Sequence, residues 1–224
     1  MAEIRVMKRV LANNDALAAD QLAGIDRQGV LSLNLMSGPG AGKTSLIERT
    51  IECLRDRVRI YVIEGDIQGS LDAERVAAAG AGVTQVNTQG ACHLDAMMLQ
   101  SVLPGIDLAA TDLLIIENVG NLVCPAEFRL PAHFNVTLVS TPEGSDKPAK
   151  YPLMFERSDL VLITKTDLLP YVDFDPAEID RAVARLRVET PVLRLSCRTG
   201  VGLDGWLDWL EQKLAARGRV GTGK

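Results

Sequence analysis

A glycine-rich segment near the start of the chain has the residues of a phosphate-binding loop. Residues 37–44 are Ser-Gly-Pro-Gly-Ala-Gly-Lys-Thr, with serine where the usual Walker A pattern has its first glycine. Glycines let backbone N–H groups surround a β-phosphate, and a helix that starts here directs its positive dipole end at it. Lysine would neutralise phosphate charge, and the threonine hydroxyl would coordinate Mg²⁺. The residues expected to contact a nucleotide are Gly38, Gly40, Ala41, Gly42, Lys43, Thr44 and Ser45.

Two later segments indicate which base the nucleotide carries. Residues 164–167, Thr-Lys-Thr-Asp, resemble the Asn-Lys-x-Asp motif of GTPases, with threonine in place of asparagine. The Asp167 carboxylate could accept hydrogen bonds from N1 and N2 of guanine, while the stem of Lys165 lies along the base. The run Ser196-Cys197-Arg198 resembles the loop that closes over guanine from the other side. Alone, Asp167 could merely cap a helix, but three motifs in this order favour GTP.

Two acidic residues at strand ends complete the expected nucleotide site. Asp66 follows one apolar run in Glu-Gly-Asp, and Glu117 ends another in Ile-Ile-Glu-Asn-Val-Gly. Both carboxylates would emerge beside the phosphate loop, where with Thr44 they could hold Mg²⁺ or orient the attacking water. The expected catalytic residues are therefore Lys43, Asp66 and Glu117. Glu-x-x-Gly, where Ras-like GTPases have Asp-x-x-Gly, indicates another class: dimeric P-loop GTPases that deliver metals or insert cofactors.

Cysteine and histidine form a second set of candidate residues. Cys92 and His93 precede a segment of helical spacing, and Cys124 follows the strand that ends at Glu117, so all three should reach the nucleotide edge of a parallel sheet. Two thiolates and an imidazole suit Zn²⁺ or Ni²⁺, and three protein ligands leave a position open for exchange. From the residues alone, the alternative is that both cysteines are small buried side chains and His93 is a polar residue at a helix start.

Other residues of these types are expected to have structural roles. Cys53 lies in an apolar helical pattern and should be in the core, Cys197 belongs to the guanine loop, and His133 lies in a connecting loop. Helical spacing places further apolar side chains on buried faces: Met97, Met98, Leu99, Trp206 and Trp209.

These residues must be positioned by alternating strands and helices. Strands are expected at residues 30–35, 59–63, 83–86, 112–116, 136–139, 160–163 and 192–195. Most of these runs are apolar throughout, which is typical of parallel strands covered on both faces. Helical spacing begins near Thr44, Leu71, Leu94, Pro176 and Leu203 and also covers residues 10–25. We therefore expect an α/β fold with a doubly wound, mainly parallel sheet. Its parts would be a helical segment at 1–29, a P-loop GTPase domain at 30–216 and a flexible tail at 217–224.

The composition restricts partners and location. The 224 residues include 24 basic and 29 acidic ones, giving a net charge of −5 and a pI near 5.1. No basic field would hold a nucleic acid, and the apolar runs are far shorter than the roughly 18 residues of a membrane span. Charged residues near the start interrupt any signal-peptide core. Four cysteines do not make a disulfide framework in a chain this long, which favours a reducing cytoplasm.

Five segments together carry a family resemblance that spans nearly the whole chain. They are residues 35–44, 64–68 (Glu-Gly-Asp-Ile-Gln), 72–75 (Asp-Ala-Glu-Arg), 92–96 (Cys-His-Leu-Asp-Ala) and 117–126 (Glu-Asn-Val-Gly-Asn-Leu-Val-Cys-Pro-Ala). With these motifs the chain resembles the hydrogenase nickel-incorporation GTPases, the HypB family.

The resemblance implies a slow GTPase that acts as a metal-delivery switch. A GTP-dependent homodimer would help to deliver nickel to the large subunit of [NiFe]-hydrogenase, together with a small nickel-binding maturation protein. It further implies an interfacial Ni²⁺ or Zn²⁺ site of Cys92, His93 and Cys124, with Lys150 at the nucleotide side of the interface. GTP or GDP and Mg²⁺ complete the implied ligands.

The chain departs from the family pattern in two places, and three alternatives stay open. Residues 1–14 contain no cysteine or histidine, although many members begin with Cys-x-x-Cys-Gly-Cys or a histidine-rich stretch, so no N-terminal nickel store is expected. Met97 stands where some relatives have histidine, which disfavours a second interfacial metal. The alternatives are a P-loop kinase that prefers ATP, a urease-maturation GTPase, and a protein that holds GTP without hydrolysing it.

Overall fold

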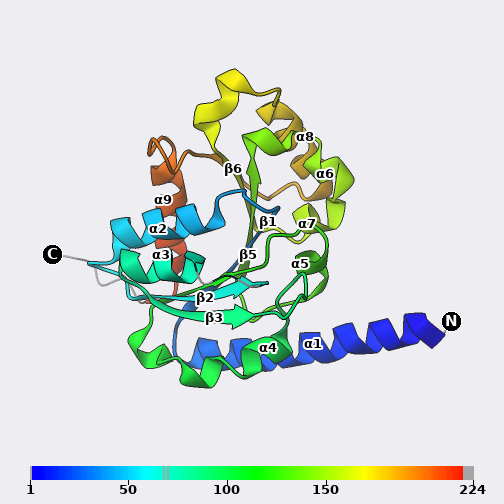
Figure 1. Ribbon diagram of the computed structural model, residues 1–224, viewed down its shortest axis with the longest axis vertical. Helices are drawn as coiled ribbons and strands as arrows, with labels where there is room; N and C mark the ends of the chain where they lie inside the picture. Colours follow the sequence, from blue (N-terminus) through cyan, green and yellow to red (C-terminus); the bar gives the residue numbers. More distant parts are fainter. Residues whose placement is uncertain (1, 68, 70, 219–224) are drawn as a thin grey trace.

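A parallel sheet of seven strands forms the centre of the computed structural model, which describes residues 2–67, 69 and 71–218, with side chains from residue 7 onward (Figure 1). In spatial order the strands are β3 (Gly82–Asn87), β2 (Ile60–Asp66), β4 (Leu113–Glu117), β1 (Leu31–Ser37), β5 (Phe134–Ser140), β6 (Leu160–Thr164) and β7 (Val192–Arg194). All neighbouring strands pair in parallel. The expected strands occur within a few residues of their predicted limits, and the doubly wound α/β fold is confirmed.

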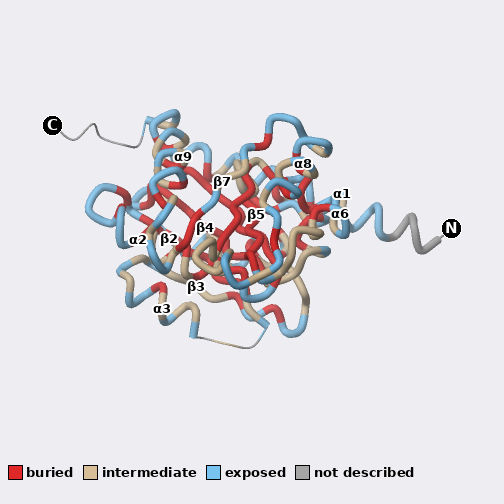
Figure 2. The backbone as a smooth tube through the Cα atoms, turned by 90° about the horizontal axis from the view of Figure 1, so that it is seen from above, coloured by how far each residue is buried: buried red, intermediate tan, exposed pale blue. Residues whose placement is uncertain are grey.

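The central strands are apolar throughout because both of their faces are covered. Every residue of β1, β4 and β6 is buried. Figure 2 shows buried backbone in red at the centre of the molecule, around β4 and β5, with exposed segments in pale blue on the outside. This arrangement explains why the strand sequences do not alternate between apolar and polar residues.

One face of the sheet is covered by α2 (Lys43–Leu54), α3 (Leu71–Ala79) and α9 (Leu203–Ala215). Trp206 of α9 is fully buried in this layer, and its indole N–H donates to the Thr50 hydroxyl at 2.9 Å. The ring of Trp209 stacks on Trp206 with centroids 5.7 Å apart. The predicted packing of the two tryptophans on the last helix is confirmed.

The other face carries two groups of helices. The helices α1 (Ala2–Arg27) and α4 (Ala96–Gln100) cover β2 and β4, whereas α5 (Cys124–Glu127), α7 (Pro152–Glu156) and α8 (Pro176–Leu186) cover β1, β5 and β6. The connections contain α6 (Lys147–Lys150) and short 3-10 helices at Leu103–Gly105, Leu108–Ala110, Thr141–Glu143 and Thr166–Tyr171.

Three expectations about helices differ from the structure. The first helix begins at Ala2 rather than near residue 10, because residues 2–23 contain no proline or glycine to end it, and its N-terminal part extends beyond the sheet (Figure 1). Cys53 is exposed, not in the core, because Ile51 and Leu54 take the buried face of α2. Met97 is 72% exposed, because Asp95 caps α4 and the short helix buries Ala96 and Leu99 instead.

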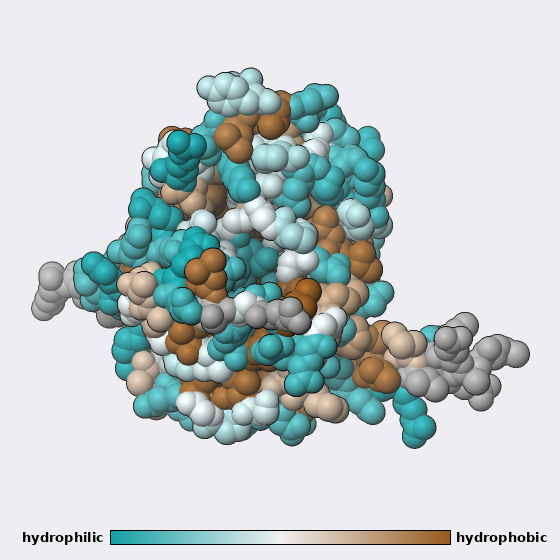
Figure 3. Space-filling model, in the orientation of Figure 1, coloured by the Kyte–Doolittle hydropathy of each residue, from teal (hydrophilic) through white to brown (hydrophobic). Residues whose placement is uncertain are grey.

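The C-terminal end and the surface complete the description. Arg217 is ion-paired with Asp26 of α1 at 2.7 Å, and residues 219–224 of the expected tail lie outside the described residues. The division into residues 1–29, 30–216 and 217–224 stays a prediction. In the part of the chain that is described, no helix combines the length and apolar character needed to cross a bilayer. Figure 3 shows apolar patches separated by polar residues on the face of Figure 1.

The strand order places the candidate residues on one edge. All seven strands run in the same direction, so their carboxyl ends lie at the same edge of the sheet. The strand β1 lies in the middle, with β4, β2 and β3 on one side and β5, β6 and β7 on the other. Ligands of open α/β sheets bind at such a point, outside the carboxyl ends of the strands.

Candidate functional site

The phosphate loop joins the end of β1 to the start of α2. Gly40 and Gly42 have φ angles of +73° and +97°, which side chains with a Cβ rarely adopt. Lys43 is buried, and its Nζ donates to the Ser37 hydroxyl at 3.1 Å. Ser37, at the position of the usual first glycine, therefore holds the lysine in the loop. Burial lowers the pKa of Lys43, and nearby carboxylates, Glu117 first, oppose this effect.

Two buried glutamates, Glu117 and Glu64, lie near this lysine. Glu117 ends β4 and accepts a hydrogen bond from the Thr44 hydroxyl at 2.8 Å, while its second oxygen, Oε2, has no partner among the described residues. Glu64 pairs in register with Glu117, so both side chains leave the sheet on the same side. Burial, and then the charge of Glu117, raises the pKa of Glu64 to about 8. Burial also raises the pKa of Glu117.

Asp66 lies at the end of β2 and organises the turn that follows. Its carboxylate accepts hydrogen bonds from the backbone N–H groups of Ile67 at 2.5 Å and Gly69 at 2.9 Å. Asp66 also lies close enough to contribute to the raised pKa of Glu64. The structure therefore brings Lys43, Thr44 and Glu117 together around a hollow of about 260 Å³ that we call the phosphate pocket, whereas Asp66 lies at the same edge of the sheet but does not line this hollow. It is lined by Gly40, Gly42, Lys43, Thr44, Ser45, Asp72, Arg75, Glu117 and Lys165.

A second hollow of about 510 Å³ adjoins the phosphate pocket, and we call it the guanine pocket after the base that the sequence predicts there. It is lined by Gly42, Ser45, Glu48, Arg49, Glu52, Lys165, Asp167, Leu168, Ser196, Cys197 and Arg198. The Ser196 hydroxyl donates to Asp167 Oδ1 at 2.6 Å, and Lys165 Nζ donates to the Gly40 carbonyl at 2.6 Å. Thr164, in place of the usual asparagine, donates its hydroxyl to the Ala41 carbonyl at 2.7 Å. The threonine thus ties the base-recognition segment to the phosphate loop.

The cysteine and histidine residues meet at the same edge. The side-chain ligand atoms of Cys92, His93 and Cys124 all lie within 4.8 Å of one another, although Cys124 is 32 residues beyond Cys92. Cys92 Sγ is 2.7 Å from Cys124 Sγ and 3.8 Å from His93 Nδ1. The imidazole of His93 stacks on Phe128 with ring centroids 3.9 Å apart. We call these three residues the metal cluster.

Two residues of the metal cluster, Cys124 and His93, have pKa values shifted toward the uncharged form. Hydrogen bonding with Cys92, followed by burial, raises the pKa of the Cys124 thiol to about 11. Burial lowers the pKa of His93. Neutral imidazole is the form that binds a metal, whereas thiols must lose their protons first.

Asn118 connects the metal cluster to the nucleotide site. It follows Glu117 directly, and it is almost fully buried. Its Oδ1 accepts a hydrogen bond from the backbone N–H of Leu94 at 3.0 Å, next to His93, while its Nδ2 donates to Asn34 of β1 at 3.2 Å. The end of β4 thus contacts both the strand that leads into the phosphate loop and the loop that carries two of the cluster residues.

Comparisons with known proteins agree with this geometry. Residues 32–194 match a family model described as CobW/HypB/UreG, nucleotide-binding domain. The hydrogenase maturation factor HypB of Azotobacter vinelandii is 45% identical over 97% of this chain and 72% of its own length. The chain belongs to the HypB family. It is thus related to the hydrogenase maturation factors and has the fold of P-loop GTPases.

Solved structures of HypB proteins have the same fold. A crystal structure of HypB from Helicobacter pylori in complex with nickel superposes with a TM-score of 0.87 at 35% identity, covering 95% of this chain and 99% of that one. HypB from Archaeoglobus fulgidus gives 0.85 at 36% identity, covering 91% of this chain and all of that one. The signal recognition particle receptor FtsY of Elizabethkingia anophelis, at 12% identity and a TM-score of 0.51 over 85% of this chain and 71% of that one, shares the fold alone.

One residue singled out through the HypB resemblance lies outside both pockets. Lys150, at the end of α6, is exposed and paired with Asp146 at 2.5 Å. The bonds from Lys147 and Lys150 lower the pKa of Asp146 to about 2. Within one chain, Lys150 therefore lines neither pocket, and its role in nucleotide binding stays a prediction.

Several residues of this HypB site could not be found from the motifs. Glu143 caps the 3-10 helix after β5 by accepting from the Ser140 N–H and hydroxyl, and its other oxygen lies against Gly38 of the phosphate loop. A side chain at position 38 would collide with it. Arg75 belongs to the Asp-Ala-Glu-Arg motif, but its place in the phosphate pocket has no local signal. Glu64 precedes Asp66 in Glu-Gly-Asp, and only the strand register reveals its contact with Glu117.

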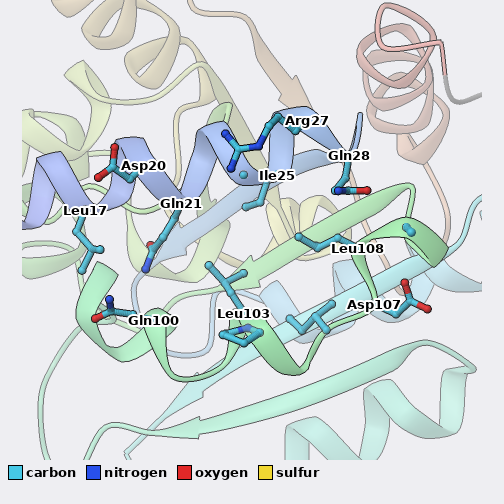
Figure 4. Close-up of a pocket in the computed structure, with 14 residues that line it drawn as sticks. Leu17, Asp20, Gln21, Ile25, Arg27, Gln28, Gln100, Leu103, Asp107 and Leu108 are labelled. Atoms are coloured by element: carbon cyan, nitrogen blue, oxygen red, sulfur yellow. The ribbon is translucent and has the colours of Figure 1, made fainter.

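A further hollow, of about 610 Å³, has no lining residue in common with the phosphate pocket or the guanine pocket. It lies between α1 and the segment that follows α4. Figure 4 shows Leu17, Gln21 and Ile25 projecting from α1 toward Gln100 and Leu103. Its lining is largely apolar, and it contains none of the residues expected to bind nucleotide or metal.

Proposed function

We propose that this protein is a GTP-hydrolysing metallochaperone that helps to insert nickel into [NiFe]-hydrogenase. The observation that carries the proposal is the contact between Asn118 and the cluster loop, because it joins the metal cluster to the strand that ends in Glu117. A change in the partners of Glu117 on nucleotide binding would therefore change the position of the loop that carries Cys92 and His93. The HypB relatives with which the chain aligns are named as hydrogenase maturation factors.

GTP is the proposed substrate. Asp167 would recognise guanine through N1 and N2, and the backbone of the phosphate loop with Lys43 would hold the β- and γ-phosphates. In hydrolysis a water oxygen bonds to the γ-phosphorus as the bond from this phosphorus to the β–γ bridging oxygen breaks, giving GDP and phosphate. Asp66, at the end of β2, would orient this water, and Lys43 would stabilise the charge that develops on the transferred group.

The residues present fit Mg²⁺ as the cofactor of this reaction. Among the described residues, one buried oxygen of Glu117 has no hydrogen-bond partner, while its other oxygen accepts a hydrogen bond from Thr44. Asp66 lies near Glu64, the neighbour of Glu117 in the sheet. Hard oxygen ligands of this kind are those that Mg²⁺ prefers. When bound, Mg²⁺ would neutralise phosphate charge between the β- and γ-phosphates. Thr44, Asp66 and Glu117 would hold it directly or through water.

Nickel is the proposed cargo, and Zn²⁺ shares its ligands. Cys92, His93 and Cys124 supply two sulfurs and one nitrogen, which leaves further coordination positions for exchange with a partner. The Helicobacter pylori structure described as a nickel complex supports this cargo. The proposed partners are a second copy of the chain, a small nickel-binding maturation protein and the hydrogenase large subunit.

GTP-dependent dimerisation would place the metal cluster at an interface between two chains. The segment from residue 141 to 152 carries Asp146, Lys147 and Lys150 on the nucleotide side, and the γ-phosphate would order it. In the monomer Lys150 is exposed and held by Asp146. It is therefore available to the other chain's nucleotide.

One experiment tests nucleotide, metal and dimer together. Ni²⁺ and Zn²⁺ are titrated into GDP-bound and GTP-analogue-bound protein while the molar mass is measured by light scattering. We expect a dimer with the analogue and metal, a monomer for Lys150→Ala under the same conditions, and no displacement of GDP by ATP. Equal affinity for ATP and GTP would exclude the GTPase function and favour a P-loop kinase. A monomer throughout would exclude the dimer switch.

A second client enzyme is suggested by some relatives. The Helicobacter hepaticus protein, 38% identical over 95% of this chain and 88% of its own length, is named a hydrogenase/urease maturation factor. Urease is therefore the alternative recipient of nickel. Activation of purified apo-hydrogenase and apo-urease by the nickel-loaded protein distinguishes the two.

A further inference from the structure

Arg75 is a cation of the phosphate pocket to which the proposed function gives no role. It lies in α3 and lines this pocket together with the phosphate-loop residues and Glu117. Burial raises the pKa of Glu117, and the charge of Arg75 is close enough to oppose part of this rise. An arginine so close to a triphosphate site is placed to contact the nucleotide.

Two carboxylates hold the guanidinium of Arg75 in this structure. Nε and Nη2 donate to the two oxygens of Glu48 in α2, at 3.0 and 2.5 Å, and Nη1 donates to Asp72 at 2.9 Å. The paired contact with Glu48 uses the geometry with which arginine also binds phosphate oxygens. A phosphate could therefore replace Glu48 without a change in the kind of contact.

Ser45 indicates which phosphate Arg75 would reach. Arg75 Nη2 lies 3.4 Å from the Ser45 hydroxyl oxygen. Ser45 lines both the phosphate pocket and the guanine pocket, so the guanidinium lies where the two hollows meet. With guanine at Asp167 and the β- and γ-phosphates at the lysine of the loop, the group at this junction is the α-phosphate.

We propose that Arg75 binds the α-phosphate of the guanine nucleotide and that Glu48 competes with this phosphate for the same guanidinium. This inference rests on the proposed function, because it requires GDP or GTP in the pocket. The α-phosphate is the same in GDP, in GTP and in the transition state of hydrolysis. Arg75 therefore strengthens binding of all three equally and does not accelerate the chemical step.

Binding of GDP and a non-hydrolysable GTP analogue is measured by isothermal titration with the full chain and Mg²⁺. We expect Arg75→Ala to weaken both nucleotides by the same factor, roughly 10- to 100-fold, with a raised KM and a kcat within about twofold of wild type. Arg75→Lys keeps the charge but not the fork, and should lose part of the affinity. Thermal unfolding checks that both variants are folded.

Glu48→Gln gives the opposite sign. Removal of the competing carboxylate should tighten both nucleotides by about threefold or more, and this gain should vanish in the Arg75→Ala background. If the salt bridge between Arg75 and Glu48 served only to join α2 to α3, Arg75→Ala and Glu48→Gln would change nucleotide affinity in the same direction. Arg57→Ala is the matched control, because Arg57 pairs with Glu211 at 2.7 Å outside both pockets and its loss should leave nucleotide affinity unchanged.

The outcomes separate this inference from the proposed function. If wild type binds neither GDP nor the analogue, both are wrong. If wild type binds and Arg75→Ala binds equally well, or if Glu48→Gln weakens binding, only the role of Arg75 is wrong. A loss confined to the GTP analogue, or a fall in kcat with unchanged GDP affinity, would place Arg75 at the γ-phosphate and overturn the assignment.

Discussion

The nucleotide site and the metal cluster share one edge of the sheet but are prepared for their ligands in opposite ways. In the nucleotide site the polar groups are already bonded to one another: Thr44 to Glu117, and Ser196 to Asp167. In the metal cluster the pKa of Cys124 is raised to about 11 by its hydrogen bond with Cys92 and by burial, and burial lowers the pKa of His93, so both of these groups favour the neutral form. A nucleotide thus exchanges existing partners, whereas a metal must displace protons.

This difference predicts which condition controls each site. The nucleotide site depends on geometry that the phosphate loop fixes in advance. The metal cluster depends on pH and on any structural change that alters the cost of ionising its thiols. Asn118 is the link through which one site can act on the other, and such coupling must be reciprocal.

Lys43→Ala should have the largest effect, and only on the nucleotide side. Loss of the buried charge beside the γ-phosphate should lower GTP hydrolysis by about 1000-fold, as measured by phosphate release. Lys213→Ala, a remote lysine over Phe134, is the control. Nickel affinity of the nucleotide-free variant should equal that of wild type. Unchanged turnover would show that the phosphate loop is assigned wrongly.

Alanine at Cys124 tests the other side of the comparison. Loss of one thiolate from a three-ligand set should weaken Ni²⁺ binding by about 100-fold in isothermal titration, and alanine at Cys92 or His93 should act similarly. Cys53→Ala is the matched control, since Cys53 is exposed on α2. If Cys124→Ala binds nickel as tightly as Cys53→Ala does, Cys124 is not part of the metal site.

Acidification should weaken the metal cluster more than the nucleotide site. Because the pKa of Cys124 lies above neutral pH, metal binding must release a proton, and affinity falls as pH falls. From pH 7.5 to 6.5 we expect at least a tenfold loss of nickel affinity, measured in buffers of different ionisation enthalpy to count the protons. GDP affinity should change much less. Equal pH dependence of both ligands would contradict the contrast between the sites.

The parts of the site that follow local patterns were predicted from the sequence. Apolar runs fixed the strands, and the parallel order then brought Cys92, His93 and Cys124 to one edge from segments far apart in the chain. Motif spacing likewise identified most of the residues that line the two hollows beside the phosphate loop, and their role in nucleotide binding stays a prediction. These predictions succeed because strand direction alone decides which residues share an edge.

The parts that depend on side-chain contacts between distant segments could not be predicted. The contact of Glu143 with Gly38 and the bond from Thr164 to Ala41 leave no trace in local spacing. The exposure of Met97 depends on where the Asp95 cap starts a five-residue helix, and three consecutive apolar residues do not reveal this rotation. Such details are set by packing.

The smallest expected effect concerns Glu64, a carboxyl group next to the nucleotide site that is protonated at neutral pH. It limits the comparison, because a group of the nucleotide site is then also kept neutral. Burial, then Glu117 and Asp66, raises its pKa to about 8, well above the value near 4.5 of an unfolded chain. Between these values the folded protein holds a proton that the unfolded chain has lost. Its free energy of unfolding must therefore decrease as pH rises from about 4.5 to 8.

Glu64→Gln removes this titration while keeping the shape of the side chain. In nucleotide-free protein the variant should unfold at higher denaturant than wild type at pH 8, by at least about 1 kcal/mol, and the advantage should shrink toward pH 5. Glu156→Gln, at an exposed position of α7, is the control and should show no such trend. A stability difference for Glu64→Gln that is independent of pH would mean that Glu64 is ionised in the folded state. The buried carboxylate of Glu64 would then add its negative charge to the nucleotide site at neutral pH. The difference in charge between the nucleotide site and the metal cluster would be larger still.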